Sequence, residues 1–362
     1  MKRQEKFIWF RITAITFGSI IAIAVYLSID SAIKSNKSGL NLNRAAWEAT
    51  YTERNLSIPT SGPREGYWGS RLGSKVPHQQ LGWHEPSRTI ESLLHIDENG
   101  QQHFTPSVAS NHRILIIGGS VAFGAYASSI STTYFHQLGT ELEQRGTPAN
   151  ITVFASAAWK SIQDLSAFQI AGPEHTPTLT VFLNGLNDLT NGARYNTLYD
   201  ERVPTPDGVE YSVLYHEHDY SARVAHYLEN MTRAAEIAAN RTKILIALQP
   251  SLAERKNLTN TDQKLLQGSL QAHRSRDDFV ASYAAIREGL ARISNADDVY
   301  FVDCSKIFHD EKHTTFTDLW HFSNRGHHLL AIQLADAIEP ILKESTPPSP
   351  GSQNSKNKPN NL

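Results

Sequence analysis

The sequence has little cysteine and little excess charge, and each shortage excludes a class of protein. Its one cysteine, Cys304, rules out an intramolecular disulfide and a metal cage built from thiolates. Because Cys304 follows the apolar run 299–302, we expect a buried structural thiol. The 34 basic and 36 acidic residues nearly cancel, to a formal net charge of -2 at pH 7. Without a basic surface, the chain is not predicted to bind nucleic acid.

Long hydrophobic runs are also scarce, since only residues 12–29 form one of membrane-spanning length. This run carries no charge, and as a helix it would extend about 27 Å, close to the roughly 30 Å thickness of the hydrocarbon core. Four basic residues precede it: Lys2, Arg3, Lys6 and Arg11. We therefore predict a single-pass membrane anchor with the rest of the chain outside the cytoplasm. A cleaved signal peptide is the alternative, although its small residues, Ala22 and Ala24, lie inside the run.

Composition divides the chain into four parts. Residues 1–30 are predicted to form a basic cytoplasmic stub and the transmembrane anchor, and residues 31–110 a polar tether with a small β-rich extension. In that extension, an Asn99-Gly100 corner inside the stretch 89–104 predicts a hairpin. Residues 111–342 form the main domain. The tail 343–362, rich in Pro, Ser and Asn, is predicted to be disordered.

Strand and helix patterns alternate through the main domain. Short apolar runs predict five strands, at 113–117, 151–154, 179–183, 244–248 and 299–302. Apolar residues at helical spacing predict intervening helices, among them 225–239 and a last helix over 324–342. Strands separated by helices indicate an α/β fold whose parallel sheet is covered on both faces.

A glycine-rich corner follows the first of these strands and presents Ser120. Gly118 and Gly119 allow a sharp turn, and the carboxyl end of a parallel strand is where such sheets keep their sites. Taken alone, the corner is equally compatible with a purely structural turn. The segment up to Gly124 lacks the spacing of a nucleotide-binding fingerprint.

Two further polar motifs follow strands and offer partners for this serine. Asn187 follows the third strand, and its carboxamide is an uncharged donor suited to an oxyanion. Asp318 and His321 precede the last helix, at a spacing that lets the carboxylate accept from the imidazole Nδ1 while Nε2 faces Ser120. The corner Gln249-Pro250 after the fourth strand falls on the same edge of the sheet.

In this order, the motifs resemble the signature blocks of the SGNH (GDSL-like) hydrolase superfamily. The matching segments are Gly119-Ser120, Ala157, Gly185-Leu-Asn187-Asp188 and Asp318-Leu-Trp-His321, and the resemblance covers about residues 111–342. It implies a flavodoxin-like three-layer sandwich and a cofactor-free serine-hydrolase mechanism. Ser120 would be the nucleophile, His321 the general base and then acid, and Asp318 the residue that orients it. The oxyanion hole would comprise the backbone N–H groups of Ser120 and Ala157 and the side chain of Asn187.

The chain departs from that family pattern at two positions. Gly119 replaces the aspartate that precedes the serine, which removes a side chain expected to brace the corner. Ala157 replaces the glycine of the second block, which keeps the N–H donor but adds a methyl group beside the oxyanion. A metal site at His216-Glu-His218 is a weaker alternative, because that segment is a polar insertion, and no metal is predicted.

The sequence thus predicts a membrane-anchored, extracytoplasmic serine esterase. Its substrate would be an acyl ester, O-acetyl esters among them, on a small molecule, a glycan or a lipid. Two alternatives remain open at this point. One is an acyltransferase that uses the same residues to modify a surface glycan, and the other is a catalytically impaired binding protein that keeps the fold.

Overall fold

A six-stranded sheet organises the chain in the computed structural model, which describes residues 76–90, 94–190, 220–239, 241–269 and 275–345. Its strands are β5 (Gln102–Phe104), β6 (Arg113–Gly118), β7 (Asn150–Ala155), β8 (Leu179–Asn184), β9 (Lys243–Leu248) and β10 (Val299–Asp303). Their order across the sheet is β10-β9-β8-β6-β7-β5. The five longer strands are parallel, and their order is that of a flavodoxin-like fold. The predicted α/β class and parallel sheet are therefore confirmed.

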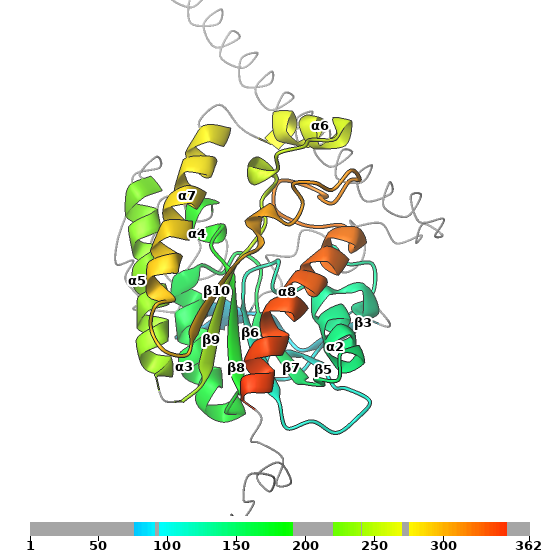
Figure 1. The fold of residues 1–362 in the computed structure, drawn as a ribbon, viewed down its shortest axis with the longest axis vertical. Coiled ribbons are helices and arrows are strands. Elements are labelled where there is room, and N and C mark those ends of the chain that lie inside the picture. The colour runs from blue at the N-terminus through cyan, green and yellow to red at the C-terminus, as the bar shows by residue number, and fades with distance from the viewer. Residues whose placement is uncertain (1–75, 91–93, 191–219, 240, 270–274, 346–362) are drawn as a thin grey trace, which may run out of the picture.

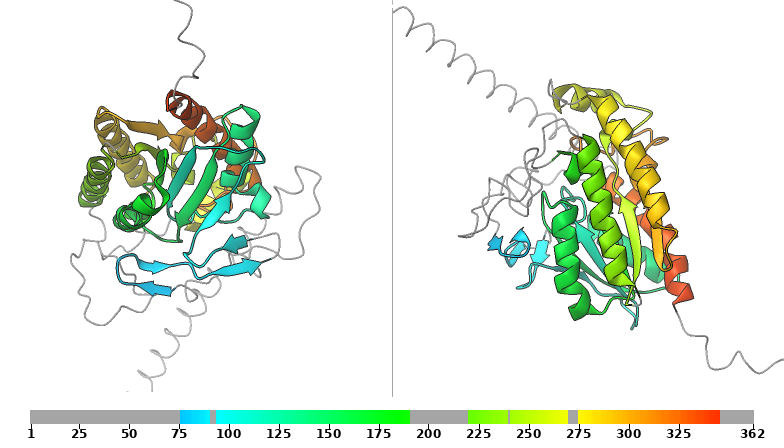
Figure 2. Two further views of the ribbon diagram at one scale, coloured as in Figure 1. Left: turned by 90° about the horizontal axis from the view of Figure 1, so that it is seen from below. Right: turned by 90° about the vertical axis from the view of Figure 1, so that its left-hand side faces the viewer.

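Helices cover both faces of this sheet (Figure 1). On one face lie α2 (Tyr134–Gln144) and α8 (Asn324–Glu344). On the other face, α3 (Ser161–His175), α5 (Tyr220–Ala238) and α7 (Arg276–Ile293) stand side by side, as the right-hand view of Figure 2 shows. The shorter helices α4 (Asn187–Thr190) and α6 (Asn260–Ser269) lie toward the carboxyl ends of the strands.

Side chains point alternately to the two faces of the sheet, so the hydrophobic core has two parts, one on each face. Ile114 and Ile116 of β6 pack on the α2 and α8 side, whereas Leu115 and Ile117 pack against the helices of the opposite face. Because successive side chains of a strand point to opposite faces, a continuous apolar run is the pattern expected of a strand covered twice. Cys304 lies in the first core, fully buried, as predicted.

The extension before the sheet contains four short strands: β1 (Val76–His78), β2 (Gly82–His84), β3 (Arg88–Ile90) and β4 (Leu94–Ile96). The left-hand view of Figure 2 shows it outside the layered sandwich. Here the predicted hairpin is wrong. The Asn99-Gly100 corner does turn the chain, but β4 pairs backward with β3, while β5 leaves to join the edge of the main sheet antiparallel to β7. Instead of forming a local hairpin with β4, β5 pairs with the six-residue strand β7 at the edge of the main sheet.

The segment 12–29, predicted to be a membrane anchor, lies outside the described residues, as do the tail 346–362 and the pair His216 and His218. Within the described part of the chain, no helix is both long enough and apolar enough to cross a membrane.

Candidate active site

The nucleophile candidate stands at the carboxyl edge of the sheet, at the end of its central strand. Gly118 closes β6 and pairs with Ala155 of β7 and Leu183 of β8. A Cβ atom on Gly118 would lie 2.2 Å from the carbonyl oxygen of Leu183, so the close approach of the two strands requires glycine there. Ser120 follows two residues later, in the turn above this edge.

Three residues predicted from separate motifs meet at this turn. The Nε2 atom of His321 lies 2.8 Å from Ser120 Oγ, and its Nδ1 lies 2.7 Å from Asp318 Oδ2. An ionised carboxylate can only accept a hydrogen bond, so Nδ1 carries the proton and Nε2 is left to accept from the serine hydroxyl. The imidazole is 18% exposed, which leaves it within reach of a substrate. This arrangement is the geometry of a nucleophile, a base and an orienting acid.

Asp318 is held ionised by its surroundings. Burial acts to raise the pKa of this carboxyl, but the neighbouring His321 and two backbone N–H groups outweigh that effect, so the net pKa lies below its ordinary value. Those N–H groups belong to Trp320 and His321, and each donates to Oδ1 at 2.7 Å. The Asp-x-x-His segment therefore forms a bend that closes on its own carboxylate.

Asn187 begins α4 beside the serine corner. Its Nδ2 atom donates to the carbonyl oxygen of Trp159 at 2.8 Å. The side chain therefore links the segment after β8 to the loop after β7. The next residue, Asp188, accepts from the backbone N–H of Ser161 at 3.1 Å and from its hydroxyl at 2.5 Å. Two residues in the second half of the segment 156–161, Trp159 and Ser161, are thus tied to the residues that follow β8.

Ala157, predicted to donate its backbone N–H to the oxyanion, lies inside that loop. The left-handed residue there is its neighbour Ala158, with φ of 70°. The carbonyl of Ala157 accepts from the indole N–H of Trp83 at 3.2 Å, and the indole of Trp159 donates back to the carbonyl of Trp83 at 2.9 Å. The N-terminal extension therefore braces the loop through an exchange of two indole donors.

A second brace from the extension is a buried carboxylate. Glu85, only 4% exposed, accepts from the hydroxyl of Ser156 at 2.8 Å and pairs with Arg88 at 3.2 Å. Neither Trp83 nor Glu85 carries a sequence signal, since each partner lies more than 70 positions away.

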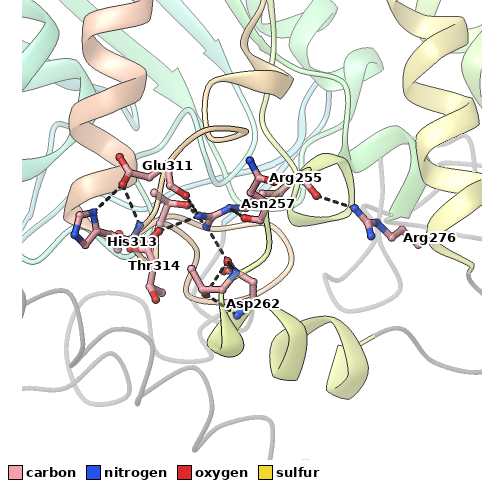
Figure 3. Close-up of polar contacts among 10 residues, drawn as sticks. Arg255, Asn257, Asp262, Arg276, Glu311, His313 and Thr314 are labelled. Carbon is pink, nitrogen blue, oxygen red and sulfur yellow. Dashed lines mark hydrogen bonds and ion pairs between the residues drawn. The ribbon is translucent and has the colours of Figure 1, made fainter.

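The loop that carries Asp318 and His321 is anchored by a buried arginine (Figure 3). Arg255 forms an ion pair with Asp262 of α6 at 2.8 Å, and both side chains are 0% exposed. Its remaining N–H groups reach oxygen atoms of Asn257, Glu311, His313 and Thr315. All five donors of the guanidinium are used, as a buried arginine requires. Three of these contacts fix residues 311–315, directly before the Asp-x-x-His bend.

The base of the same bend is closed by backbone hydrogen bonds. Thr317 N donates to His321 O at 2.9 Å, and Ser323 N donates to Thr315 O at 2.8 Å. Leu319 accepts at its carbonyl from Leu252 N, in the loop after β9 that also carries Gln249 and Pro250. The predicted corner after the fourth strand thus supports the bend rather than standing apart from it.

Two cavities lie at the opposite, amino edge of the sheet. The larger, about 720 Å³, is lined by Phe168, Pro173, Ile237 and Arg241 among others, and sits where β8 and β9 begin. The smaller one involves Asn111, His112 and Thr178, again before the strands start. Neither is near Ser120. Among the described residues, no three metal-ligating side chains converge.

Comparison with known proteins finds structural likeness at low sequence identity. No family model matches the chain, and no curated protein matches it. In solved structures, it is similar to an acetyl xylan esterase, AlAXEase, at 12% identity and a TM-score of 0.43, over 62% of this chain and 99% of that one.

Two more solved structures give likenesses of the same level. TesA matches at 14% identity and a TM-score of 0.42, over 64% of this chain and 99% of that one. A GDSL-like lipase from Bacteroides thetaiotaomicron matches at 14% and 0.38, over 65% and 89%. Because these identities and TM-scores are low, we infer the chemistry of this chain from its own side chains.

Proposed function

We propose that this chain is a serine esterase of the SGNH type, with Ser120 as nucleophile, His321 as general base and acid, and Asp318 as the orienting carboxylate. The observation that carries the proposal is the continuous chain of contacts from Ser120 Oγ through His321 to Asp318, at 2.8 and 2.7 Å. Hydrogen-bond reach between nucleophile, base and orienting group is the signature of an activated nucleophile.

In the proposed reaction, His321 Nε2 takes the proton of Ser120 while Oγ attacks the ester carbonyl carbon. The resulting imidazolium is stabilised by Asp318 across Nδ1. It then returns the proton to the departing alcohol oxygen, leaving an acyl group on Ser120. Water repeats the sequence and releases the acid, with His321 again accepting and returning one proton.

The negative oxygen of the tetrahedral intermediate needs fixed donors. We assign this role to the backbone N–H groups of Ser120 and Ala157 and to the carboxamide of Asn187. One N–H of Asn187 is held by Trp159 O, which fixes the plane of the carboxamide. A donor held in place before the reaction stabilises developing charge without reorganisation.

Acetyl esters are the first substrates to test, because small acyl groups make the least demand on an unknown pocket. The purified chain should release acetate from an activated acetyl ester, and Ser120→Ala and His321→Ala should each lose several orders of magnitude in turnover. A glycan acceptor added to the assay distinguishes an acyltransferase: transfer to its hydroxyl groups, in place of acetate release, would show that activity. Turnover unchanged in Ser120→Ala would disprove the mechanism.

A catalytically impaired binding protein is the less favoured reading, since all three reactive side chains stand in contact. Such a protein would bind a glycan or lipid ester equally well with Ser120→Ala and show no turnover with either form.

We further propose that residues 12–29 anchor the domain in a membrane, with the catalytic part outside the cytoplasm. The uncharged run and its basic amino-terminal flank support this topology. A reporter fused after Leu362 should be active only outside the cytoplasm, and the protein should stay with membranes through alkali washes. A soluble mature form that begins after residue 29 would instead show a cleaved signal.

A further inference from the structure

An aromatic ring lies against the imidazole of His321. The rings of Tyr126 and His321 have centroids 4.8 Å apart and an angle of 33° between their planes. Tyr126 comes from the turn that follows Ser120, so the nucleophile and this ring belong to one segment. The two in-plane nitrogen atoms of His321 already have their partners in Asp318 and Ser120. Tyr126 contacts the remaining part of the imidazole, its face.

The backbone of Tyr126 is in a conformation that a tyrosine rarely adopts. Its φ is 69°, in the left-handed region, where residues other than glycine, asparagine and aspartate are uncommon. Such an outlier persists only where the surrounding structure imposes it, and outliers of this kind cluster at functional sites.

The start of α8 imposes this conformation by holding the chain on both sides of Tyr126. On one side, Nε2 of His327 donates to the carbonyl of Ala125 at 2.9 Å, from a fully buried position. On the other side, Asn324 accepts from Ser128 N at 3.0 Å and donates to Ser128 Oγ at 2.7 Å. Asn324 and His327 follow His321 closely in the chain. The helix that begins after the general base therefore also fixes the ring that covers it.

We propose that Tyr126 is a positioning residue for His321, an inference that rests on the proposed esterase function. Its ring keeps the imidazole from tilting out of the plane that contains Ser120 Oγ and Asp318 Oδ2. It also presents an aromatic face to the imidazolium that forms when Nε2 takes the serine proton, and aromatic faces attract cations. Both effects act on the chemical step, and neither requires contact with the substrate.

Two substitutions at this position separate the ring from the backbone. Tyr126→Phe keeps the aromatic face. Tyr126→Asn deletes it, while asparagine is among the residues that tolerate a left-handed φ. A matched control is Tyr300→Asn on β10, which removes a tyrosine that contacts Lys243 with its ring and Glu344 with its hydroxyl, away from the site. The three variants and the parent are compared as the full chain, with kcat, KM and the melting temperature measured on one acetyl ester.

We expect Tyr126→Asn to lower kcat roughly 10- to 100-fold, in line with the cost of misplaced reacting groups, with little change in KM. Tyr126→Phe should retain kcat to within about threefold, and Tyr300→Asn should lower the melting temperature without lowering kcat. The rate of Ser120 labelling by a fluorophosphonate should follow kcat across the series. Rescue by phenylalanine is the result that a purely structural role of the tyrosine would not predict.

Equal kcat in Tyr126→Asn and the parent would overturn the proposal, as would equal losses in Tyr126→Asn and Tyr126→Phe. The parent chain separates this failure from that of the function itself. A parent that neither turns over esters nor reacts with the fluorophosphonate contradicts the esterase assignment. If the parent is active and Tyr126→Asn has the same kcat, only the role of Tyr126 is contradicted.

Discussion

A Cβ atom on Gly119 would lie 2.2 Å from Nδ2 of Asn187. Position 119, where the family that the motifs resemble has an aspartate, is therefore where the carboxamide of Asn187 packs against the serine corner. No side chain fits at position 119 while Asn187 keeps its bond to Trp159 O. An aspartate at position 119 would clash with the carboxamide of Asn187 where it now lies.

Gly119→Ala should displace Asn187 and lower kcat by roughly 10²-fold, approaching the loss of an oxyanion donor. Because the clash is with the carboxamide, the same substitution should cost much less in an Asn187→Ala background. A double-mutant cycle on kcat/KM measures this coupling. Additive losses would mean that Gly119 is required for another reason, such as the 3.3 Å that would separate a Cβ atom at this position from Trp159 O.

Trp83→Phe should remove the indole donor to Ala157 O while keeping an aromatic ring in the extension. We expect a loss of about 1 kcal/mol in the free energy of unfolding, from one lost hydrogen bond to the part-buried carbonyl of Ala157, and a several-fold lower kcat. Ser87→Ala is the matched control, since Ser87 donates to Ile96 O within the extension and does not touch the loop. If both variants leave kcat unchanged, the extension supports the fold without supporting the site.

Arg255→Lys should be strongly destabilising even though it keeps the positive charge. Lysine has three donors at a single point and cannot replace the five that Arg255 uses, so we expect a loss of about 3–5 kcal/mol, as for a broken buried pair. Arg292→Lys is the control, because its pair with Glu288 is 65% and 75% exposed and should contribute under about 1 kcal/mol. Equal urea midpoints for both variants would contradict the anchoring role of Arg255.

His327 should make stability depend on pH. Burial lowers the pKa of this imidazole, the bond to Ala125 O partly opposes that effect, and the nearby His321 adds to it, so that the net pKa is about 4. Between pH 6.5 and 4 the unfolded chain binds a proton that the folded chain does not, so stability falls as the pH falls. The difference amounts to about 3 kcal/mol at pH 4.

His327→Gln tests this dependence, because glutamine can still donate to Ala125 O but does not titrate. Other histidines with lowered pKa values, such as His136 and His226, contribute equally to both proteins and cancel in the comparison. From pH 7 to pH 4, the parent should lose about 3 kcal/mol more than the variant in urea unfolding. Parallel losses would show that His327 protonates in the folded state without penalty.

The strands of the sheet could be predicted because each is a short apolar run buried on both faces, as residues 113–117 show. The local sequence pattern gave a wrong prediction where a strand pairs with a partner far away in the chain. The Asn99-Gly100 corner has the composition of a hairpin turn, yet β5 pairs with β7, about fifty residues later. A corner fixes a change of direction but does not specify the partner strand.

The same limit applies to the site. Four site residues could be predicted together, because each follows a strand or precedes a helix in a recognisable motif: Ser120, Asn187, Asp318 and His321. Tyr126 and Arg255 have no motif, because their importance lies in what folding places beside them. A positive φ at a tyrosine and a buried guanidinium with five acceptors become visible only in three dimensions.

The most direct measurement of the central claim is the site of covalent labelling by a fluorophosphonate, located by mass spectrometry of peptides. We expect one adduct, on Ser120. Labelling should be abolished in Ser120→Ala and His321→Ala, and should persist in Ser131→Ala, a serine of the same region outside the proposed triad. An adduct on another residue, or undiminished labelling of Ser120→Ala, would contradict it.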